Sequence, residues 1–357
     1  MHALSSLARS RLWLGFGALA LAAAGAFFFW RDDRSDSLVT TPLLAIEAAS
    51  GRALYFNGAA YPWLKARRPE LLGGDPRAFA QAARNPTLFR QLDRERRFDA
   101  LLLVGSAGEY RALLDHLLET KDFTPTYVDH WAIFFQRGAE RAWRAEDFAP
   151  VRARLAALSG RERAQCLAEL GAKLVALRRM EEARAFLDES QRLDAASPQA
   201  WNGMALLHMQ RGEWKEAMAC ADRALGGRLE PLSAVATKTQ VLYATKRFSE
   251  AYDLSCKLVE QLPDDPAILF KHAEICHQAH AYRAEIRALE KLISRAQDEQ
   301  QPTSGYRIYL GQAYAGAGDA ERSVAAFTKA LADPELPEDQ KEFARDNVAR
   351  IKSRTEP

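Results

Sequence analysis

The sequence has few cysteines, and none of them forms a closely spaced pair. Its 357 residues contain Cys166, Cys220, Cys256 and Cys276, with no CxxC motif. A thioredoxin-type redox site, a zinc knuckle and a haem attachment site each need such a pair, so the spacing argues against all three. All four lie in expected helices at positions that suit a small apolar residue, and we interpret them as reduced packing residues.

The chain also lacks a large excess of charge of either sign. Its formal net charge is +2, which gives no reason to expect a nucleic-acid partner. The apolar and charged fractions, 48% and 27%, are those of a folded protein. Low-complexity sequence is absent after Trp30.

Only one long hydrophobic run is present. Residues 12–30 form a stretch of 19 residues without a charge, long enough to cross a bilayer as a helix. Arg9 and Arg11 precede it, which predicts a single-pass anchor in the cytoplasmic (inner) membrane with the C-terminal domains in the periplasm. A cleaved signal peptide is the alternative. Cleavage near AAAGA would leave residues 27–30, FFFW, at the start of the mature chain, so we favour an uncleaved anchor over residues 1–35.

The C-terminal half repeats with a period of about 34 residues. Five copies are expected over residues 164–337, preceded by a linker helix at 141–163 and followed by a capping helix and tail at 338–357. Small residues at matching positions, such as Gly171 and Ala205, would let the two helices of a repeat approach closely. Because a single repeat cannot bury its apolar face alone, the copies are expected to stack.

These copies resemble the tetratricopeptide repeat, most clearly in GEWKEAMACADRAL and YLGQAYAGAGDAERSVAAFTKAL. The resemblance implies an α-helical solenoid, which a small α/β domain and the transmembrane helix would precede. Glu285 and Ser323 depart from it, since alanine is expected at both positions. Those two repeats are expected to pack more loosely.

In this family the first helices of the repeats line a groove that binds a protein or peptide. The resemblance places ten residues of this chain in that groove: Asn202, Leu206, Met209, Gln240, Tyr243, Phe270, Glu274, His277, Ile308 and Gln312. Their mixture of aromatic, apolar and amide side chains suits an extended peptide or a partner helix. The lysine, asparagine and arginine cluster with which some members grip chaperone tails is missing.

The fourth repeat contains a candidate metal site. His272, Cys276 and His280 are spaced at i, i+4 and i+8, so they share one face of a helix. Two of them occupy packing positions of the repeat and no fourth ligand is near in sequence. We therefore expect no metal, and no cofactor either.

Residues 38–140 show a different pattern. Short strands are expected at 43–48, 52–57 and 98–104, and the segments TPTYV and WAIFFQR favour a hairpin. Asp75 and Asn85, each followed by proline, should begin helices over 77–83 and 88–94. A further helix is expected over 109–119, and together these elements predict a small α/β domain with a mixed sheet.

The turn at Gly105-Ser106-Ala107-Gly108 is the segment most suggestive of chemistry. A nucleophilic serine elbow needs a glycine two residues before the serine, where Val104 stands. The turn also does not match the sequence patterns of phosphate-binding loops (GxxxxGK[ST]) or of dinucleotide-binding loops (GxGxxG). We therefore interpret the turn as an ordinary connection between a strand and a helix, and predict no catalytic residue.

Residues 50–137 resemble the soluble C-terminal domain of bacterial membrane glycosyltransferases of the mannosyltransferase-like class, over the stretch FDALLLVGSAGEYRALLDHLLETKDFTPTYVDHWAIFFQRG. The resemblance includes no catalytic motif. In those enzymes the catalytic carboxylates lie in a multi-pass membrane part that this chain lacks. It therefore implies an accessory domain without transferase activity.

The leading hypothesis is a membrane-anchored scaffold, not an enzyme, that mediates protein–protein interactions in the bacterial cell envelope. The alternative is an accessory subunit of a glycosyltransferase or polysaccharide assembly system, whose α/β domain binds a glycan or nucleotide. A third hypothesis is an enzyme that uses Ser106 or the helix face of His272.

Overall fold

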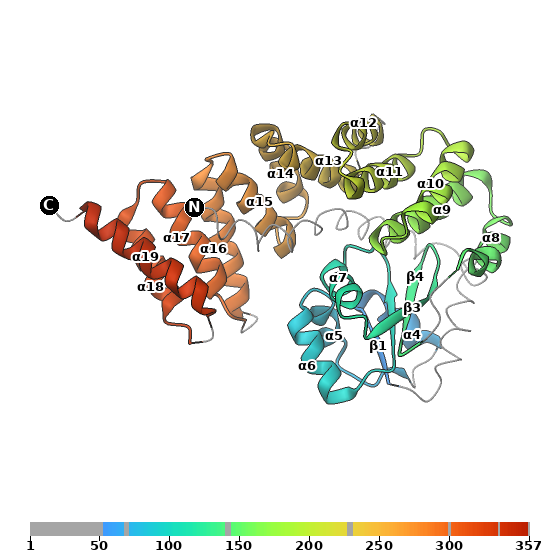
Figure 1. The fold of residues 1–357 in the computed structure, drawn as a ribbon, viewed down its shortest axis with the longest axis horizontal. Coiled ribbons are helices and arrows are strands. Elements are labelled where there is room, and N and C mark those ends of the chain that lie inside the picture. Colours follow the sequence, from blue (N-terminus) through green and yellow to red (C-terminus); the bar gives the residue numbers. More distant parts are fainter. Residues whose placement is uncertain are drawn as a thin grey trace. The chain divides into compact units, whose positions relative to one another are not determined.

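The computed structural model describes residues 53–67, 71–139, 144–226, 231–298, 301–334 and 336–355 (Figure 1). The described residues fall into two compact units, with the division between Val241 and Leu242. The expected membrane anchor and the expected strand at 43–48 lie outside the described residues. Within the described residues, no helix combines the length and apolarity needed to cross a membrane.

The first unit contains a four-stranded mixed sheet. Strand β1 (Leu54–Phe56) pairs in parallel with β2 (Ala100–Val104), and β2 pairs antiparallel with β4 (Ala132–Arg137). Strand β3 (Phe123–Val128) pairs with β4 as a hairpin and completes the order β1-β2-β4-β3. Every residue of β2 is buried, as its unbroken run of apolar residues predicts.

Short helices connect and cover these strands. They are the 3-10 turn η2 (Gly58–Ala60), α4 (Tyr61–Arg67), α5 (Pro76–Ala82), α6 (Pro86–Arg96) and α7 (Arg111–Thr120). Asp75 accepts a hydrogen bond from the backbone N–H of Arg77, and Asn85 accepts one from that of Thr87. The two expected caps therefore begin α5 and α6.

An aromatic cluster fills the space between β1 and helices α5 and α6. The ring of Tyr55 lies 5.1 Å from that of Phe79, 5.2 Å from that of Phe89 and 5.5 Å from that of Phe98. The Tyr55 hydroxyl is buried, and it donates a 2.7 Å hydrogen bond to the carbonyl of Phe79. The hydroxyl therefore enters the core without an unpaired polar group.

Asn57 extends the pairing of β1 and β2 by one position. Its Nδ2 donates to the carbonyl of Val104 at 2.7 Å, and its Oδ1 accepts from the N–H of Val104 at 2.9 Å. The side chain is only 2% exposed. It therefore satisfies both backbone groups at the end of β2, where no strand residue is available to pair with them.

Helices continue the first unit after the sheet. The 3-10 turn η4 (Ala145–Phe148) and α8 (Ala149–Leu155) come first, and Ser159 then caps α9 (Gly160–Ala176) in a capping box with Glu162. Because of this cap the solenoid begins at residue 160, inside the segment expected to be a linker. Next along the chain come α10 (Met180–Leu193), α11 (Pro198–Arg211) and α12 (Trp214–Leu225).

Helix α13 (Leu232–Ala244) contains the division between the units, and six helices follow it. They are α14 (Phe248–Gln261), α15 (Pro266–Gln278), α16 (Tyr282–Asp298), α17 (Ser304–Gly316), α18 (Ala320–Leu331) and α19 (Glu338–Thr355). Helices α11, α13 and α15 begin at Pro198, Leu232 and Pro266, and this even spacing reproduces the period of the sequence.

Leu187 of α10 holds the first two repeats together. It is fully buried against two glycines, one in α9 and one in α11. A methyl group on Gly171 would lie 2.6 Å from Cγ of Leu187, and one on Gly203 would lie 2.4 Å from its Cδ2. The two helices can therefore approach Leu187 only because these positions have no side chain.

The α/β domain and the first repeats share one core. Buried residues from β1 through to Ala221 of α12 belong to a single hydrophobic cluster. Lys173 of α9 joins the two parts, because its Nζ donates a 2.5 Å hydrogen bond to the carbonyl of His130 in the β3–β4 turn. This side chain is only 4% exposed, and burial lowers its pKa.

Helix α19 covers the end of the second unit. Phe343, Val348 and Ile351 pack against a cluster that includes Phe327 and Ala330 of α18. The solenoid therefore ends in a helix that shields the last apolar face, as a stacked repeat requires.

Candidate functional site

Four of the ten expected groove residues belong to the first unit. Leu206 and Met209 of α11 are half-buried, whereas Asn202 is 4% and Gln240 is 9% exposed. The Oδ1 atom of Asn202 is buried and has no hydrogen-bond partner. An unpaired buried oxygen carries an energetic cost that an N–H donor from a ligand would remove.

The other six belong to the second unit, and they differ in accessibility. Tyr243, Phe270, Glu274, His277 and Gln312 are half-buried. Ile308 is 7% exposed and packs in the terminal cluster with Phe327, so its side chain supplies core packing rather than open surface.

An aromatic face forms on the first helices of the second unit. The ring of Phe270 lies 5.9 Å from that of Tyr306 and 5.3 Å from that of Tyr309. Lys271 places its ammonium 5.4 Å from the ring centre of Tyr243. We call Tyr243, Phe270, Tyr306 and Tyr309 the aromatic face. All four are half-buried, so part of each residue remains in contact with solvent.

The acidic residue beside this face is neutralised. Glu274 lies 2.6 Å from Nζ of Lys271, with side-chain exposures of 15% and 13%. Burial raises the pKa of Tyr309, and the charge of Glu274 adds to that effect. The aromatic face therefore presents ring surface and a closed ion pair rather than a free charge.

Glu285 occupies the position where the repeat expects alanine, and it is buried. Its side chain is 2% exposed, and its Oε1 lies 3.0 Å from Nδ1 of His277. This contact raises the pKa of His277, while burial raises the pKa of Glu285. The stability that His277 gains is present below pH 6.5 and is lost as the pH rises through its raised pKa. The departure from the repeat is therefore compensated by a neighbouring side chain rather than by looser packing.

Of the three candidate metal ligands, His272 and Cys276 lie close together, whereas His280 is engaged elsewhere. His272 accepts or donates at Nδ1 with Ser255 at 2.8 Å, and its Nε2 lies 3.4 Å from Sγ of Cys276. His280 is exposed, and its Nδ1 contacts the hydroxyl of Tyr282 at 2.8 Å instead. In the described part of the chain, no three histidine, cysteine, aspartate or glutamate side chains form a group that could hold a metal ion.

His272 should make the second unit sensitive to acid. Burial lowers its pKa to about 4, and the charge of Arg287 adds to the effect. Between pH 6.5 and about pH 4 the imidazole of His272 is protonated in the unfolded chain but neutral in the folded one. Acid therefore favours the unfolded state over this range. We expect this to cost about 3 kcal/mol at pH 4, at about 1.4 kcal/mol per pH unit. Urea unfolding from about pH 8 to pH 4 measures the free energy of unfolding of the native chain and of His272→Gln. The difference in favour of the native chain should shrink by this amount as the pH falls. A difference that stays constant with pH would contradict the prediction.

The glycine turn after β2 is closed by a carboxylate. Gly105 adopts a φ of 90°, and its N–H donates to the carbonyl of Trp131 at 3.1 Å. The N–H of Ser106 donates to Oε1 of Glu109 at 3.3 Å, and burial raises the pKa of Glu109. A carboxylate thus takes the amide that a phosphate would need, which disfavours an anion site here. Helix α7 begins at Arg111 rather than at residue 109, after a turn in which the N–H of Glu109 donates to the carbonyl of Ser106 at 3.0 Å.

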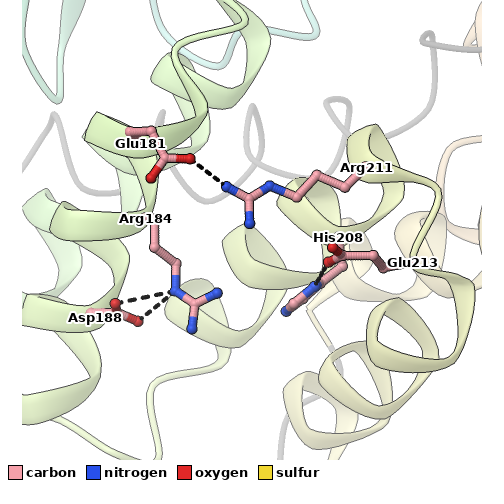
Figure 2. Close-up of polar contacts among 6 residues, drawn as sticks. All are labelled: Glu181, Arg184, Asp188, His208, Arg211 and Glu213. Carbon is pink, nitrogen blue, oxygen red and sulfur yellow. Dashed lines mark hydrogen bonds and ion pairs between the residues drawn. The ribbon is translucent and has the colours of Figure 1, made fainter.

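One ion pair connects the first two repeats, and two further polar contacts lie within single repeats (Figure 2). Arg211 at the end of α11 lies 2.8 Å from Glu181 of α10, and His208 lies 2.5 Å from Glu213. Arg184 contacts Asp188 within α10 at 3.1 Å. Because Glu181 is largely exposed to solvent, we expect the Glu181–Arg211 ion pair to add little to the free energy of unfolding.

Sequence reasoning from the repeat missed Tyr306, Tyr309 and Lys271. The two tyrosines are spaced at i and i+3, so a search for aromatic pairs on one helix face would have found them. The position of Lys271 over Tyr243 depends on the packing of two helices and has no signal in the sequence.

Comparison with known proteins gives distant structural likenesses only. YrrB, described as a TPR protein with an unusual peptide-binding site, has 17% identity and a TM-score of 0.45, over 51% of this chain and 92% of its own. MamA from Desulfovibrio magneticus RS-1 has 22% identity and a TM-score of 0.40, over 46% and 94%. TTC0263 of Thermus thermophilus, a thermophilic TPR protein, has 15% identity and a TM-score of 0.35, over 52% and 99%.

No family model matches the chain, and no curated relative matches it. The resemblance of residues 50–137 to a glycosyltransferase domain therefore gains no support from these comparisons. Because the structural scores and identities are low, the assignment of a helical repeat solenoid rests on the helix pairs and the even spacing of their starts.

Proposed function

We propose that the chain is a membrane-anchored scaffold whose helical repeats bind a peptide segment or a helix of a partner protein. The aromatic face carries this proposal. Half-buried rings supply large contact area at little cost in side-chain entropy, which is why aromatic residues dominate binding surfaces. The ion pair of Lys271 and Glu274 beside them supplies polar groups that can fix the orientation of a bound backbone.

The partner is proposed to lie in the cell envelope. The uncharged run of residues 12–30 supports an anchor, and Arg9 and Arg11 before it favour a periplasmic location for the domains after the anchor. A glycan or nucleotide ligand for the α/β domain is the weaker alternative, because Glu109 already occupies the backbone amide of Ser106.

Peptides selected from a display library on the full chain should bind the aromatic face. The double substitution Tyr243→Ala with Phe270→Ala is expected to weaken such a peptide by at least about tenfold, because truncated aromatic anchors typically cost more than about 1 kcal/mol each. Binding is measured by fluorescence anisotropy, and retained circular dichroism shows that the variant is folded.

Leu193→Ser provides the matched control, since Leu193 is the exposed large apolar residue of the described chain, at 41%, and lies at the end of a second helix. Equal binding by the double variant and by this control would argue against the aromatic face. Deletion of residues 12–30 tests the anchor: it should release the chain from the membrane pellet in a high-salt wash, in which the native chain stays bound, and leave peptide binding unchanged.

A further inference from the structure

Helices α5 and α6 carry a concentration of positive charge that the whole chain does not share. Residues 76–97 contain six arginines and two acidic residues, a local excess of +4, whereas all 357 residues together carry +2. All six arginines are exposed, and the two helices pack side by side (Figure 1). None of these cations is a lysine, so the surface offers planar guanidinium groups.

The acidic residues of this region are already engaged. Asp93 lies 2.5 Å from Nη2 of Arg137 and accepts a hydrogen bond from the N–H of Phe98. Glu95 accepts one from Gln91 at 3.2 Å. Asp75, just before α5, caps that helix. Asp93 is therefore neutralised by Arg137, which lies outside residues 76–97, whereas Glu95 keeps a charge that the local excess of +4 already includes.

Three of the arginines gather at the C-terminal half of α6. Arg90 and Arg94 are spaced at i and i+4, which places them on one side of the helix, and Arg97 follows as its C-cap with a φ of 52°. We call these three residues the arginine stripe. In the described structure none of them forms an ion pair; Arg90 makes only a hydrogen bond to Oγ1 of Thr87, within its own helix, at 3.2 Å. Arg96, by contrast, packs over the ring of Phe79 and donates to the carbonyl of Gly73.

Such a stripe is not needed for folding. An arginine that stabilises a protein usually pairs with a carboxylate or covers a ring: Arg137 does both, with Asp93 and Phe123, and Arg96 covers Phe79. Three neighbouring cations without a counterion repel one another instead. Their electrostatic cost would be recovered only when an anionic surface lies against them.

We propose that the arginine stripe docks on an anionic phospholipid surface. A guanidinium group binds phosphate through two parallel hydrogen bonds, and an exposed side of a helix suits a broad surface rather than a small ligand. The inference rests on the proposed membrane association. Residues 31–52 between the apolar run and the described domain can span at most ~75 Å, so the stripe is within reach of the same membrane.

The test uses the full chain in nanodiscs of neutral phosphatidylcholine, with and without added phosphatidylglycerol. A dicarbonyl reagent labels exposed arginines, and mass spectrometry reads the labelling at each residue. Arg90, Arg94 and Arg97 should be protected in the anionic discs only, and added salt should restore labelling. Exposed Arg161, Arg178 and Arg192 serve as internal controls and should react equally in both discs.

A charge variant makes the effect quantitative. In the chain that lacks residues 12–30, the substitutions Arg90→Gln, Arg94→Gln and Arg97→Gln together should weaken binding to anionic vesicles by about 100-fold, at about fivefold per basic residue. The matched variant Arg161→Gln, Arg178→Gln and Arg192→Gln removes the same net charge and should bind as the native chain does. An equal loss in both variants would mean that net charge, not the stripe, is responsible.

The outcomes separate this inference from the proposed anchor. Stable incorporation into discs without protection of the stripe would overturn the inference and leave the anchor intact. If the chain does not enter the discs, the anchor fails, and salt-sensitive vesicle binding that the stripe variant abolishes would still support the stripe. Equal protection by polyglutamate or DNA at the same ionic strength would overturn the assignment to lipid.

Discussion

Replacing Gly203 with alanine and Leu187 with alanine is expected to damage the first unit separately and to be partly repaired in combination. The new methyl group of Gly203→Ala would lie 2.4 Å from Cδ2 of Leu187, so overpacking should cost about 1–3 kcal/mol. Leu187→Ala alone should cost about 2–5 kcal/mol, because Leu187 is fully buried and its loss leaves a cavity.

In the double variant the added methyl group enters the space that Leu187 vacates. We expect the destabilisation of the double variant to be about 2 kcal/mol smaller than the sum of the two single costs, as is typical of residues in direct contact. Urea unfolding of the four proteins, followed by circular dichroism, gives this coupling energy. Gly305→Ala is the control, because a methyl group there meets no atom within 4 Å and should stabilise α17 slightly. Additive costs would show that Leu187 does not pack against Gly203 as described.

Replacing Asn57 with leucine should destabilise the sheet by about 2–6 kcal/mol. Leucine has a similar volume but cannot pair with the N–H and carbonyl of Val104, which Asn57 contacts at 2.9 and 2.7 Å. Two buried backbone groups would be left without partners, each at a cost of about 1–3 kcal/mol. The free energy of unfolding measures the loss, and amide exchange at Val104 should rise in step.

Two other substitutions test this explanation. Asn57→Asp keeps the acceptor for the Val104 N–H but sets a carboxylate oxygen against the Val104 carbonyl, so its defect should lessen at acidic pH, where the acid is protonated. Asn85→Ala removes an exposed helix cap instead and should cost only about 1 kcal/mol. If Asn57→Leu were no worse than Asn85→Ala, the pairing of Asn57 with β2 would carry little of the stability of the sheet.

Much of the fold could be predicted because short-range sequence patterns determine where many of its helices begin. The repeat period placed the starts of α11, α13 and α15, and the pairs Asp75-Pro76 and Asn85-Pro86 placed α5 and α6. Such patterns depend on neighbours in the sequence. The capping box at Ser159 is also visible in the sequence, and it moves the start of the solenoid from residue 164 to residue 160.

The remaining features depend on contacts between distant segments. Asn57 forms hydrogen bonds with Val104, 47 residues away in the sequence, and Lys173 donates one to the carbonyl of His130, 43 residues away. Ile308 occupies an expected groove position but packs in the terminal cluster with Phe327 and, further along the chain, Leu336. No spacing rule contains these contacts, because each depends on which surface the fold brings against the residue.

The shared core of the sheet and the first two repeats limits how the protein can change over evolutionary time. A repeat that contacts only its neighbours can be duplicated or lost as a cassette. The repeats built from α9 to α12 are not cassettes in this sense, because their buried apolar residues belong to the same hydrophobic cluster as those of the sheet, and Lys173 of α9 donates to the β3–β4 turn. A gene fusion or truncation that cut the chain at residue 160 would expose Leu167, Leu170 and Leu174, which are buried in that core. Descendants of this protein should therefore vary in the number of their later repeats while inheriting residues 53–225 as one block.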